Sequence, residues 1–588
     1  MNTAFTTVEH KTDLCIIGGG LAGLCAAVAA ARHGIQVVLM QERPMLGGNA
    51  SSEIRMWICG AGGGFDNMRE TGIIEELLLE NQYRNPDKNY SIWDGILYGI
   101  AARQPGITLL LNCSCNACDA EENRIKSVTG WQLTTQEYHK VYASIFADCS
   151  GDSVLAPLTG ARYFLGRESA EAYKEIGGQA HADLKTMGLS CLMQARYEPV
   201  PSEFIPPEWA NHYTKEDLPY RLPDLSSTGE NFWFIEIGGD KDSIRDTESL
   251  RDELLRICYG VWDFCKNAPE NKEKNRHWRL DWMGILPGKR ESRRYEGDYV
   301  LTQNDLADGV LFDDIVAYGG WSMDDHNPVG FYSKLPPNKH HRTKCPYGIP
   351  YRSLYSVNIE NLMFAGRNIS ATHIALSSTR VMATCAVLGQ AVGTAAAIAV
   401  KSGLTPRSAG QMKIREIQRA LMNDDCYLPS LIREVSKLTK DATLLCPSPH
   451  AENLRNGIDR PVGSNNNGCR LRPGEDITYC FEKPVYVQRA RIVFDSDLNR
   501  DSLPDGFKRP MLANRPENCP DSYVPTSLVR KYRLEAFSEN GEKSIFEVSN
   551  NYQRLNCVPI KMSVTKLRLV PTETWGAPDF SLFSFELE

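Results

Sequence analysis

The sequence has few of the features that direct a protein to nucleic acid, to a membrane or into the secretory pathway. It has no dense run of lysine and arginine in its 588 residues, and its formal net charge is −8, which argues against nucleic acid or an anionic membrane as a partner. The apolar run from Leu14 to Ala31 lacks a preceding basic segment and is interrupted by glycines, so it predicts neither a signal peptide nor a membrane span. The segment Ala383 to Val400 is built from small residues and predicts a helix packed inside a protein. We therefore expect a cytoplasmic protein.

The cysteines form neither a disulfide framework nor a zinc pattern. All 18 are scattered through the chain, which is typical of reduced thiols. Cys113, Cys115 and Cys118 include one CxxC, but on a strand Cys115 and Cys118 point to opposite faces, and no second CxxC completes a site. We expect no metal.

The chain is long enough for two or three domains. Residues 13–17 and 36–40 predict buried strands around a glycine-rich turn and an alanine-rich helix, which is a βαβ start. Buried strands are also expected in 107–118, 125–132, 144–149 and 361–365, followed by a long helix over 378–402. Residues 165–350 are rich in proline, tryptophan and tyrosine, and short strands dominate after 446. The predicted boundaries are 1–165, 166–355, 356–445 and 446–588.

The motif Gly18-x-Gly20-x-x-Gly23 follows the first strand and opens the helix. In a dinucleotide-binding fold the first glycine permits a tight turn, the second lets the backbone approach a pyrophosphate, and the third lets helix and strand pack closely. The pyrophosphate then sits at the helix N-terminus. At the end of the second strand, Gln41 or Glu42 can accept a hydrogen bond from ribose, and the lack of a basic residue at Gln41 argues against a 2′-phosphate.

The order of these features resembles the glutathione-reductase-like flavoproteins. The chain has a single fingerprint at its N-terminus, a Gly47-Gly48 doublet after the second strand, and a late strand followed by Gly366-Arg367 and a helix. In that class the doublet contacts FAD. Glu53 and Arg55 follow the doublet, and which side of the flavin they would face stays open.

The segments "LGGNASSEIRM", "DCSGD", "GKRESRR", "PYGIPYRSLYS" and "AGRNISATHIALSSTRVMATC" resemble the FAD-dependent oxidoreductase family over residues 12–440. The resemblance implies an α/β, Rossmann-like FAD-binding domain with an inserted α+β substrate domain. It also implies FAD as the cofactor, and the absence of histidine between residues 34 and 138 predicts non-covalent binding. The expected FAD contacts are Gly18, Gly20, Gly23, Gln41, Glu42, Arg43, Gly47, Gly48, Asn49, Ser51, Ser52, Asp148, Gly151, Asp152, Gly366, Arg367, Arg380, Val381 and Met382.

Two histidines are candidates for the base that removes a hydroxyl proton. His373 lies between the Gly-Arg turn and the helix expected to face the flavin, and His326 follows Asp324 and Asp325, which could orient it. In the family resemblance the segment after Pro287 faces the active cavity. The resulting candidates for holding the substrate are Arg290, Arg293, Tyr347 and Arg352.

Residues 446–588 resemble the galactose-binding-like (discoidin-type) all-β jelly rolls, on "NGIDRPV", "EKPVYVQRARIVFDSD" and "VTKLRLVPTETWGAPDFSLFSFEL". This resemblance implies either carbohydrate recognition or a module that packs on the rest of the protein, because fold alone does not determine function.

Three functions remain open from the sequence. The first is oxidation of a hydroxyl of a sugar or glycoside to a ketone, or the reverse, by hydride transfer to flavin N5. The second is a fumarate-reductase-like reduction of a C=C bond, with arginines that clamp a carboxylate. The third is a non-enzymatic flavin-holding or sugar-binding module. The partners expected are a small molecule, most simply a carbohydrate, and an unidentified electron acceptor. The oligomeric state stays open, and a homo-oligomer is one of the alternatives.

Overall fold

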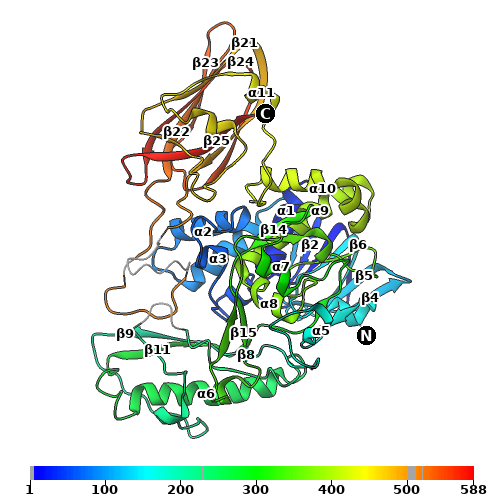
Figure 1. Ribbon diagram of the computed structural model, residues 1–588, viewed down its shortest axis with the longest axis vertical. Helices are drawn as coiled ribbons and strands as arrows, with labels where there is room; N and C mark the ends of the chain where they lie inside the picture. Colours follow the sequence, from blue (N-terminus) through cyan, green and yellow to red (C-terminus); the bar gives the residue numbers. More distant parts are fainter. Residues whose placement is uncertain (1–4, 227–230, 501–510, 520) are drawn as a thin grey trace.

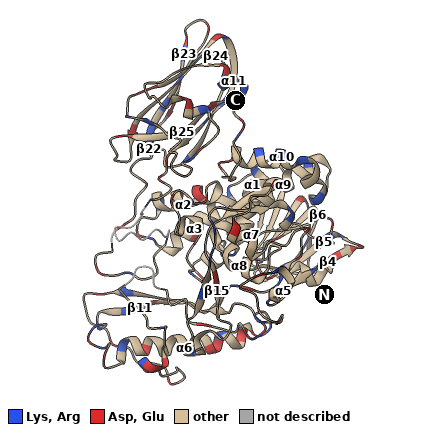
Figure 2. Ribbon diagram, in the orientation of Figure 1, with Lys and Arg blue, Asp and Glu red and all other residues tan. Residues whose placement is uncertain are grey.

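The computed structural model describes residues 5–226, 231–500, 511–519 and 521–588. The β-rich C-terminal part lies at the top of Figure 1, the cofactor domain in the middle and the segment around helix α6 at the bottom. Lysines and arginines gather on α10 (Pro406–Asn423), whereas α6 (Thr247–Asn267) carries charges of both signs (Figure 2).

A mainly parallel sheet forms the centre of the cofactor domain. Its strand order is β3-β2-β1-β6-β5-β4, with β18 beside β6. Ile17, Met40, Asp148 and Phe364 end four neighbouring parallel strands in register, so the loops that follow meet at one edge. The strands are β1 (Thr7–Ile17), β2 (Val37–Met40), β3 (Ile107–Leu110), β4 (Cys113–Glu121), β5 (Arg124–Gln132), β6 (Glu137–Asp148) and β18 (Leu362–Phe364).

Two small-residue helices pack against each other beside this sheet. α1 (Leu21–Arg32) and α9 (Met382–Ser402) approach so closely that a Cβ at Gly389 would lie 1.9 Å from the carbonyl oxygen of Ala22. Within the described residues α9 is the one helix long and apolar enough to cross a membrane, and 94% of its most apolar window is buried inside the protein.

The inserted segment is built from small antiparallel sheets around helix α6. β8 (Leu189–Ser190) pairs with β10 (Glu236–Ile237) and with β12 (Gly288–Lys289). The remaining pairs that position the site are β9 (Met193–Tyr197) with β11 (Trp278–Met283), β14 (Ile315–Gly319) with β17 (Tyr347–Pro350), and β15 (Met323–His326) with β16 (Asn338–His341).

The C-terminal part is an antiparallel β-sandwich with its own apolar core. Its strand order is β20-β25-β21-β24-β22-β23, with β19 beside β21. Together with the parallel sheet, this sandwich confirms the predicted fold class. The strands are β19 (Thr443–Leu445), β20 (Cys469–Leu471), β21 (Ile477–Phe494), β22 (Val529–Phe537), β23 (Lys543–Val548), β24 (Leu555–Thr574) and β25 (Phe580–Leu587).

Ion pairs and a descending chain segment attach the sandwich to the rest of the molecule. Arg500 contacts Glu75 at 2.8 Å and Arg554 contacts Asp425 at 2.8 Å, and all four side chains are buried. Residues 511–519 lie near β9 (orange in Figure 1), where the Arg515 amide donates to the carbonyl of Ala195 at 2.8 Å.

Two local expectations require correction. The single helix predicted over 378–402 is two helices, α8 (His373–Thr379) and α9, because the chain turns at Arg380-Val381. The strand expected over 107–118 is also divided, because β3 ends at Leu110 and β4 begins at Cys113. Helix α3 (Tyr90–Ala102) was not among the elements predicted from the sequence.

We predict that Gly389→Ala lowers the free energy of unfolding by about 1–3 kcal/mol, because the new methyl group would collide with the backbone of α1. Gly95→Ala in α3 is the matched control, because no atom lies within 4 Å of the position that its methyl group would take. This control should be neutral or stabilising by up to about 1 kcal/mol. Thermal unfolding of both variants is the measurement, and equal melting temperatures would contradict the close approach of α1 and α9.

Candidate active site

A cavity opens at the edge where the parallel strands end. It extends from the glycine turn after β1 to the segment Leu286–Pro287 and the start of α6. Among the predicted cofactor residues, the cavity is lined by Gly18, Gly20, Gln41, Glu42, Arg43, Gly47, Gly48, Asn49, Gly151, Asp152, Gly366, Arg367, Arg380 and Met382.

Two glycine loops form the floor of this cavity. The Gly47 amide donates to the Gly19 carbonyl at 2.8 Å, and Gln41 Oε1 accepts from the Gly19 amide at 2.7 Å. A Cβ added at Gly20 would have Gly48 Cα as its nearest atom, at 4.0 Å, so a side chain at Gly20 would extend into the cavity and occupy it. The open space beside Gly20 and Gly48, together with the adjoining N-terminus of α1, suits a pyrophosphate.

Charged groups line the same cavity. Asp152 contacts Lys289 Nζ at 2.7 Å and Arg367 Nη2 at 2.8 Å. Burial alone would raise the pKa of Asp152, but the charges of Arg367 and Lys289 outweigh it and hold that pKa well below its usual range. Arg380 Nε is buried and has no hydrogen-bond partner among the described residues, which leaves a donor available to an anionic ligand. The residues present therefore fit an anionic dinucleotide such as FAD.

Four predicted cofactor residues lie just outside this lining. Gly23 is needed for packing, since a Cβ there would be 1.8 Å from the Gly18 carbonyl oxygen. Ser51 donates to the Gly48 carbonyl at 2.7 Å, and the Ser52 amide donates to Asp94 at 3.0 Å. Asp148 is fully buried and accepts from the Tyr295 hydroxyl at 2.6 Å. These residues shape the loops around the cavity.

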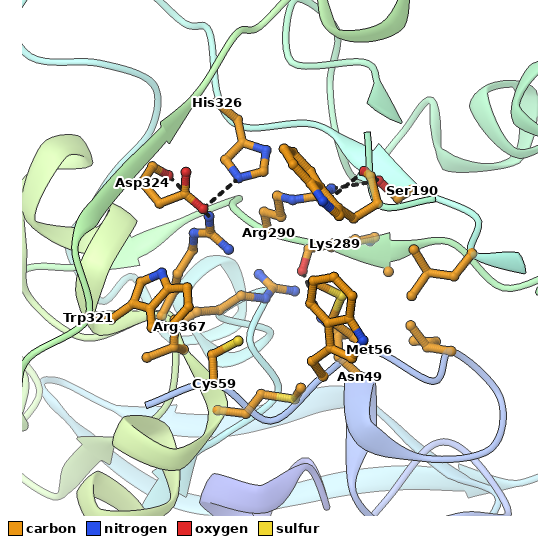
Figure 3. A pocket seen from close by; sticks show the side chains of 18 of the residues that line it. Asn49, Met56, Cys59, Ser190, Lys289, Arg290, Trp321, Asp324, His326 and Arg367 are labelled. Atoms are coloured by element: carbon orange, nitrogen blue, oxygen red, sulfur yellow. Dashed lines mark hydrogen bonds and ion pairs between the residues drawn. The ribbon is translucent and has the colours of Figure 1, made fainter. Parts of the chain in front are cut away.

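A second cavity, shown in Figure 3, adjoins the first. The two share Asn49, Ile54, Lys289, Arg367, Arg380 and Met382. Val381 also lines the second cavity, at the start of α9. The walls include Trp57, Trp233 and Trp321, so a ligand there would meet aromatic faces and charged groups together.

His326 stands in this second cavity between two carboxylates. Its Nδ1 lies 2.5 Å from Glu236 Oε2, and its Nε2 lies 3.2 Å from Asp324 Oδ2. Burial would raise the pKa of Glu236, but Arg290 and His326 lower it below the ordinary value. Burial would likewise raise the pKa of Asp324, but His326 and Arg380 hold it well below the usual range.

Arg290 lies beside this group. Its Nη1 donates to Ser190 Oγ at 2.8 Å and its Nη2 donates to the Trp233 carbonyl at 3.0 Å. Its Nη1 is also 3.5 Å from Glu236 Oε2, and its Nε is buried without a hydrogen-bond partner. Of the six predicted catalytic residues, Arg290 and His326 are the two that line the cavity.

The other four candidates lie away from the cavity. His373 is 1% exposed and is held by Glu291 at 2.8 Å and Asp325 at 3.0 Å. Arg293 lies over the Tyr163 ring, buried Tyr347 forms a hydrogen bond with Ser378, and Arg352 pairs with Asp314 near the surface. The structure therefore gives these four residues no direct access to a ligand in either cavity.

Several lining residues had no signal in the sequence. Ser190 and Trp233, which line the cavity, and Glu236, which contacts His326, come from short strands and loops of the inserted segment, far along the chain from His326. Glu53 lines the cofactor cavity, whereas Arg55 packs between the rings of Tyr90 and Trp282 at 4.6 and 4.3 Å. Glu53 and Arg55 thus face different surroundings.

Residues 13–421 match the family described as FAD dependent oxidoreductase. This match covers more than half of the chain, and the protein belongs to that family. It is thus an FAD-dependent oxidoreductase, and the family implies FAD as its cofactor.

A search of curated proteins finds no match. Among solved structures, a geranylgeranyl bacteriochlorophyll reductase-like protein from Thermoplasma acidophilum is 12% identical, with a TM-score of 0.33, over 71% of this chain and 86% of its own. The family 32 carbohydrate-binding module of Streptococcus pneumoniae EndoD is 14% identical, with a TM-score of 0.19, over 26% of this chain and 99% of its own. Likeness at this level does not identify a substrate.

We predict that Gly20→Val yields folded protein with little bound flavin, because the side chain would enter the cavity while its Cβ stays 4.0 Å from the nearest backbone atom, Gly48 Cα. Gly23→Val is the comparison, since it would collide with Gly18 and should lower stability as well. Flavin absorbance per protein and thermal unfolding are the measurements. Full flavin content in Gly20→Val would contradict this assignment of the cavity.

The buried His373 predicts a pH dependence of stability. Burial would lower its pKa, but Glu291 and Asp325 raise it to about 10 from an unfolded value of 6.5. The folded state therefore holds a proton that the unfolded state loses, so this stabilisation is complete below pH 6.5 and disappears as the pH rises through about 10. Stability should fall by at most about 1.4 kcal/mol per pH unit in that window. Chemical unfolding at several pH values should show a shallower slope in His373→Gln, and an equal slope would refute the shift.

Proposed function

We propose that this FAD-dependent oxidoreductase oxidises a hydroxyl of a sugar or glycoside to a ketone, or catalyses the reverse. The observation that carries the proposal is His326, a histidine in the cavity next to the cofactor cavity, with Glu236 at 2.5 Å from its Nδ1. A histidine held in this way by a carboxylate on one nitrogen can act as a base through the other.

The residues of the chain supply binding and proton transfer. FAD, when bound, supplies the acceptor for the hydride that leaves the carbinol carbon. Glu236 orients the His326 ring and stabilises its protonated form, and Nε2 takes the hydroxyl proton once the substrate oxygen replaces Asp324 as its partner. Arg290 stands beside this position and stabilises negative charge on the oxygen as its proton leaves.

The lining supports a polyhydroxylated substrate. Trp57, Trp233 and Trp321 offer apolar faces for the C–H surfaces of a sugar ring, and Asn49, Ser190 and Asn338 offer polar groups for hydroxyls. The resemblance of the C-terminal sandwich to galactose-binding-like domains supports the same class of ligand. We include carbohydrate recognition by the sandwich in the proposal.

The charges disfavour reduction of a C=C bond in a carboxylate substrate. Such a reaction needs arginines that can clamp the carboxylate. Arg290, Arg367 and Arg380 line the cavity, but each already has a carboxylate neighbour, namely Glu236, Asp152 and Asp324 respectively. A carboxylate substrate would have to compete with these buried partners.

We predict that His326→Gln lowers the rate of flavin reduction by a glycoside about 10²- to 10⁴-fold, because the variant lacks the base. Flavin content and thermal unfolding should stay close to those of the wild type. His212→Gln is the control, since His212 is a largely exposed histidine away from the cavity, and it should keep full activity.

An anaerobic screen of glycosides for loss of the oxidised-flavin absorbance tests the function itself. Reduction by at least one glycoside, with a keto product, is the expected result. If no sugar reduces the flavin while the reduced enzyme transfers electrons to an α,β-unsaturated carboxylate, the proposal fails and the fumarate-reductase-like reaction replaces it.

A further inference from the structure

The hairpin of β15 and β16 presents four polar side chains to the substrate cavity. Asp324 pairs with His340 across the two strands, and His326 pairs with Asn338. Residues two apart on a strand share a face, and all four of these side chains line the cavity. Asp325 points to the opposite face, where it holds His373. One face of the hairpin therefore collects two histidines, a carboxylate and an amide.

Asp324 lies between a buried histidine and an exposed one. Its Oδ2 is 3.2 Å from His326 Nε2, and its Oδ1 is 3.7 Å from His340 Nδ1. The side chain of His326 is 3% exposed, whereas that of His340 is 57% exposed. The longer distance is within the reach of one bridging water or a small rotation of the exposed ring. The three groups thus connect the interior of the cavity to solvent.

The hydrogen bonds of Asn338 indicate which ring nitrogen of a neutral His340 carries the proton. Asn338 Nδ2 donates to Asp324 Oδ1 at 2.5 Å, and it is also 3.3 Å from His340 Nε2. Nε2 is then the acceptor, so the proton of a neutral His340 sits on Nδ1, beside Ser322 Oγ at 2.9 Å and near Asp324. A second proton on Nε2 would displace the amide donor, and the charged ring would turn toward water.

We propose that His340 and Asp324 carry the substrate proton between His326 and solvent. The inference rests on the proposed function: as an alcohol becomes a ketone, the carbinol C–H bond loses a hydride to the cofactor and the O–H bond loses a proton to His326. Once the product oxygen leaves Nε2, Asp324 regains its contact with His326 and takes that proton, then passes it to Nδ1 of a His340 whose own proton is on Nε2. The doubly protonated ring releases the Nε2 proton to a water or buffer molecule, which leaves the Nδ1–H form that accepts from Asn338, and exchange with solvent restores the Nε2–H form. In the reverse reaction the same groups deliver one proton to the ketone oxygen.

The surrounding charges suit this path. Glu236 and Arg290 face His326, and Arg380 lies 3.7 Å from Asp324. With Arg380 and the histidines nearby, the ionised form of Asp324 is favoured, so the carboxylate passes the proton on without retaining it.

The test follows flavin reduction and proton release together. Wild-type FAD-loaded enzyme and His340→Gln are mixed, without oxygen and in weak buffer, with a glycoside that reduces the flavin, and a pH-indicator dye reports the proton. His340→Gln should delay proton release by about tenfold or more relative to flavin reduction in the same sample, and it should regain normal release when imidazole is added. Proton release in step with reduction in this variant would overturn the proposal.

His341→Gln is the matched control. His341 follows His340 on the same strand but faces Asp325, and the described cavity lining does not include it. This variant should release its proton without delay. A delay of similar size in both variants would indicate general damage to the hairpin and would also overturn the relay.

A second measurement needs no substrate and separates failure of the relay from failure of the proposed function. Histidine labelled with ¹³C allows the titrations of His326 and His340 to be followed by NMR in FAD-loaded enzyme. A relay requires that His340→Gln shift the titration of His326, because both rings share Asp324. An unchanged titration of His326 would refute the connection, whatever the glycoside screen shows.

Discussion

The active cavity depends on an ion pair that lies behind it. His373, at the start of α8 in the cofactor domain, is held by Glu291 and by Asp325 of the β15–β16 hairpin, and all three lie inside the protein or close beneath its surface. Charges this buried are costly unless they are paired, and removal of one partner costs about 3–5 kcal/mol. The contact thus fixes the hairpin on the cofactor domain. Because successive side chains of a strand point to opposite faces, it also directs Asp324 and His326 toward the cavity.

The residues that line the cofactor cavity and the proposed base come from different parts of the chain. Parallel strands that end together bring the glycine loops to one edge of the sheet, as in other α/β folds that bind ligands there. The inserted segment covers that edge with its own short strands and contributes Glu236, Arg290 and His326. The proposed chemistry therefore lies where the edge of the parallel sheet meets the inserted segment, and neither part alone contains the whole set of residues.

Local patterns made the fold and the cofactor edge predictable, whereas long-range packing decided the rest. The βαβ start and the glycine fingerprint depend on neighbouring residues, and His326 with Asp324 was proposed because they are two residues apart. Glu236 was missed because it is 90 residues from His326 in the chain. His373 was placed near the flavin from its motif, but its position at the start of α8 points it at Glu291. Tyr347 and Arg352 were likewise predicted in a segment whose side chains pair with Ser378 and Asp314.

The C-terminal sandwich also supports a wall of the site. Beyond the sandwich's long strand β21, the carbonyl of Leu512 accepts from Gln194 Nε2 at 2.9 Å, and Gln194 Oε1 accepts from Arg55 Nη1 at 2.7 Å. Arg55 directly precedes Met56 and Trp57, which line the substrate cavity. Because buried polar contacts of this kind are lost together when one partner moves, the position of this wall depends on residues 511–519. These residues lie between the sandwich strands β21 and β22 in the chain, so packing against the site and the proposed carbohydrate recognition are compatible roles for the C-terminal part.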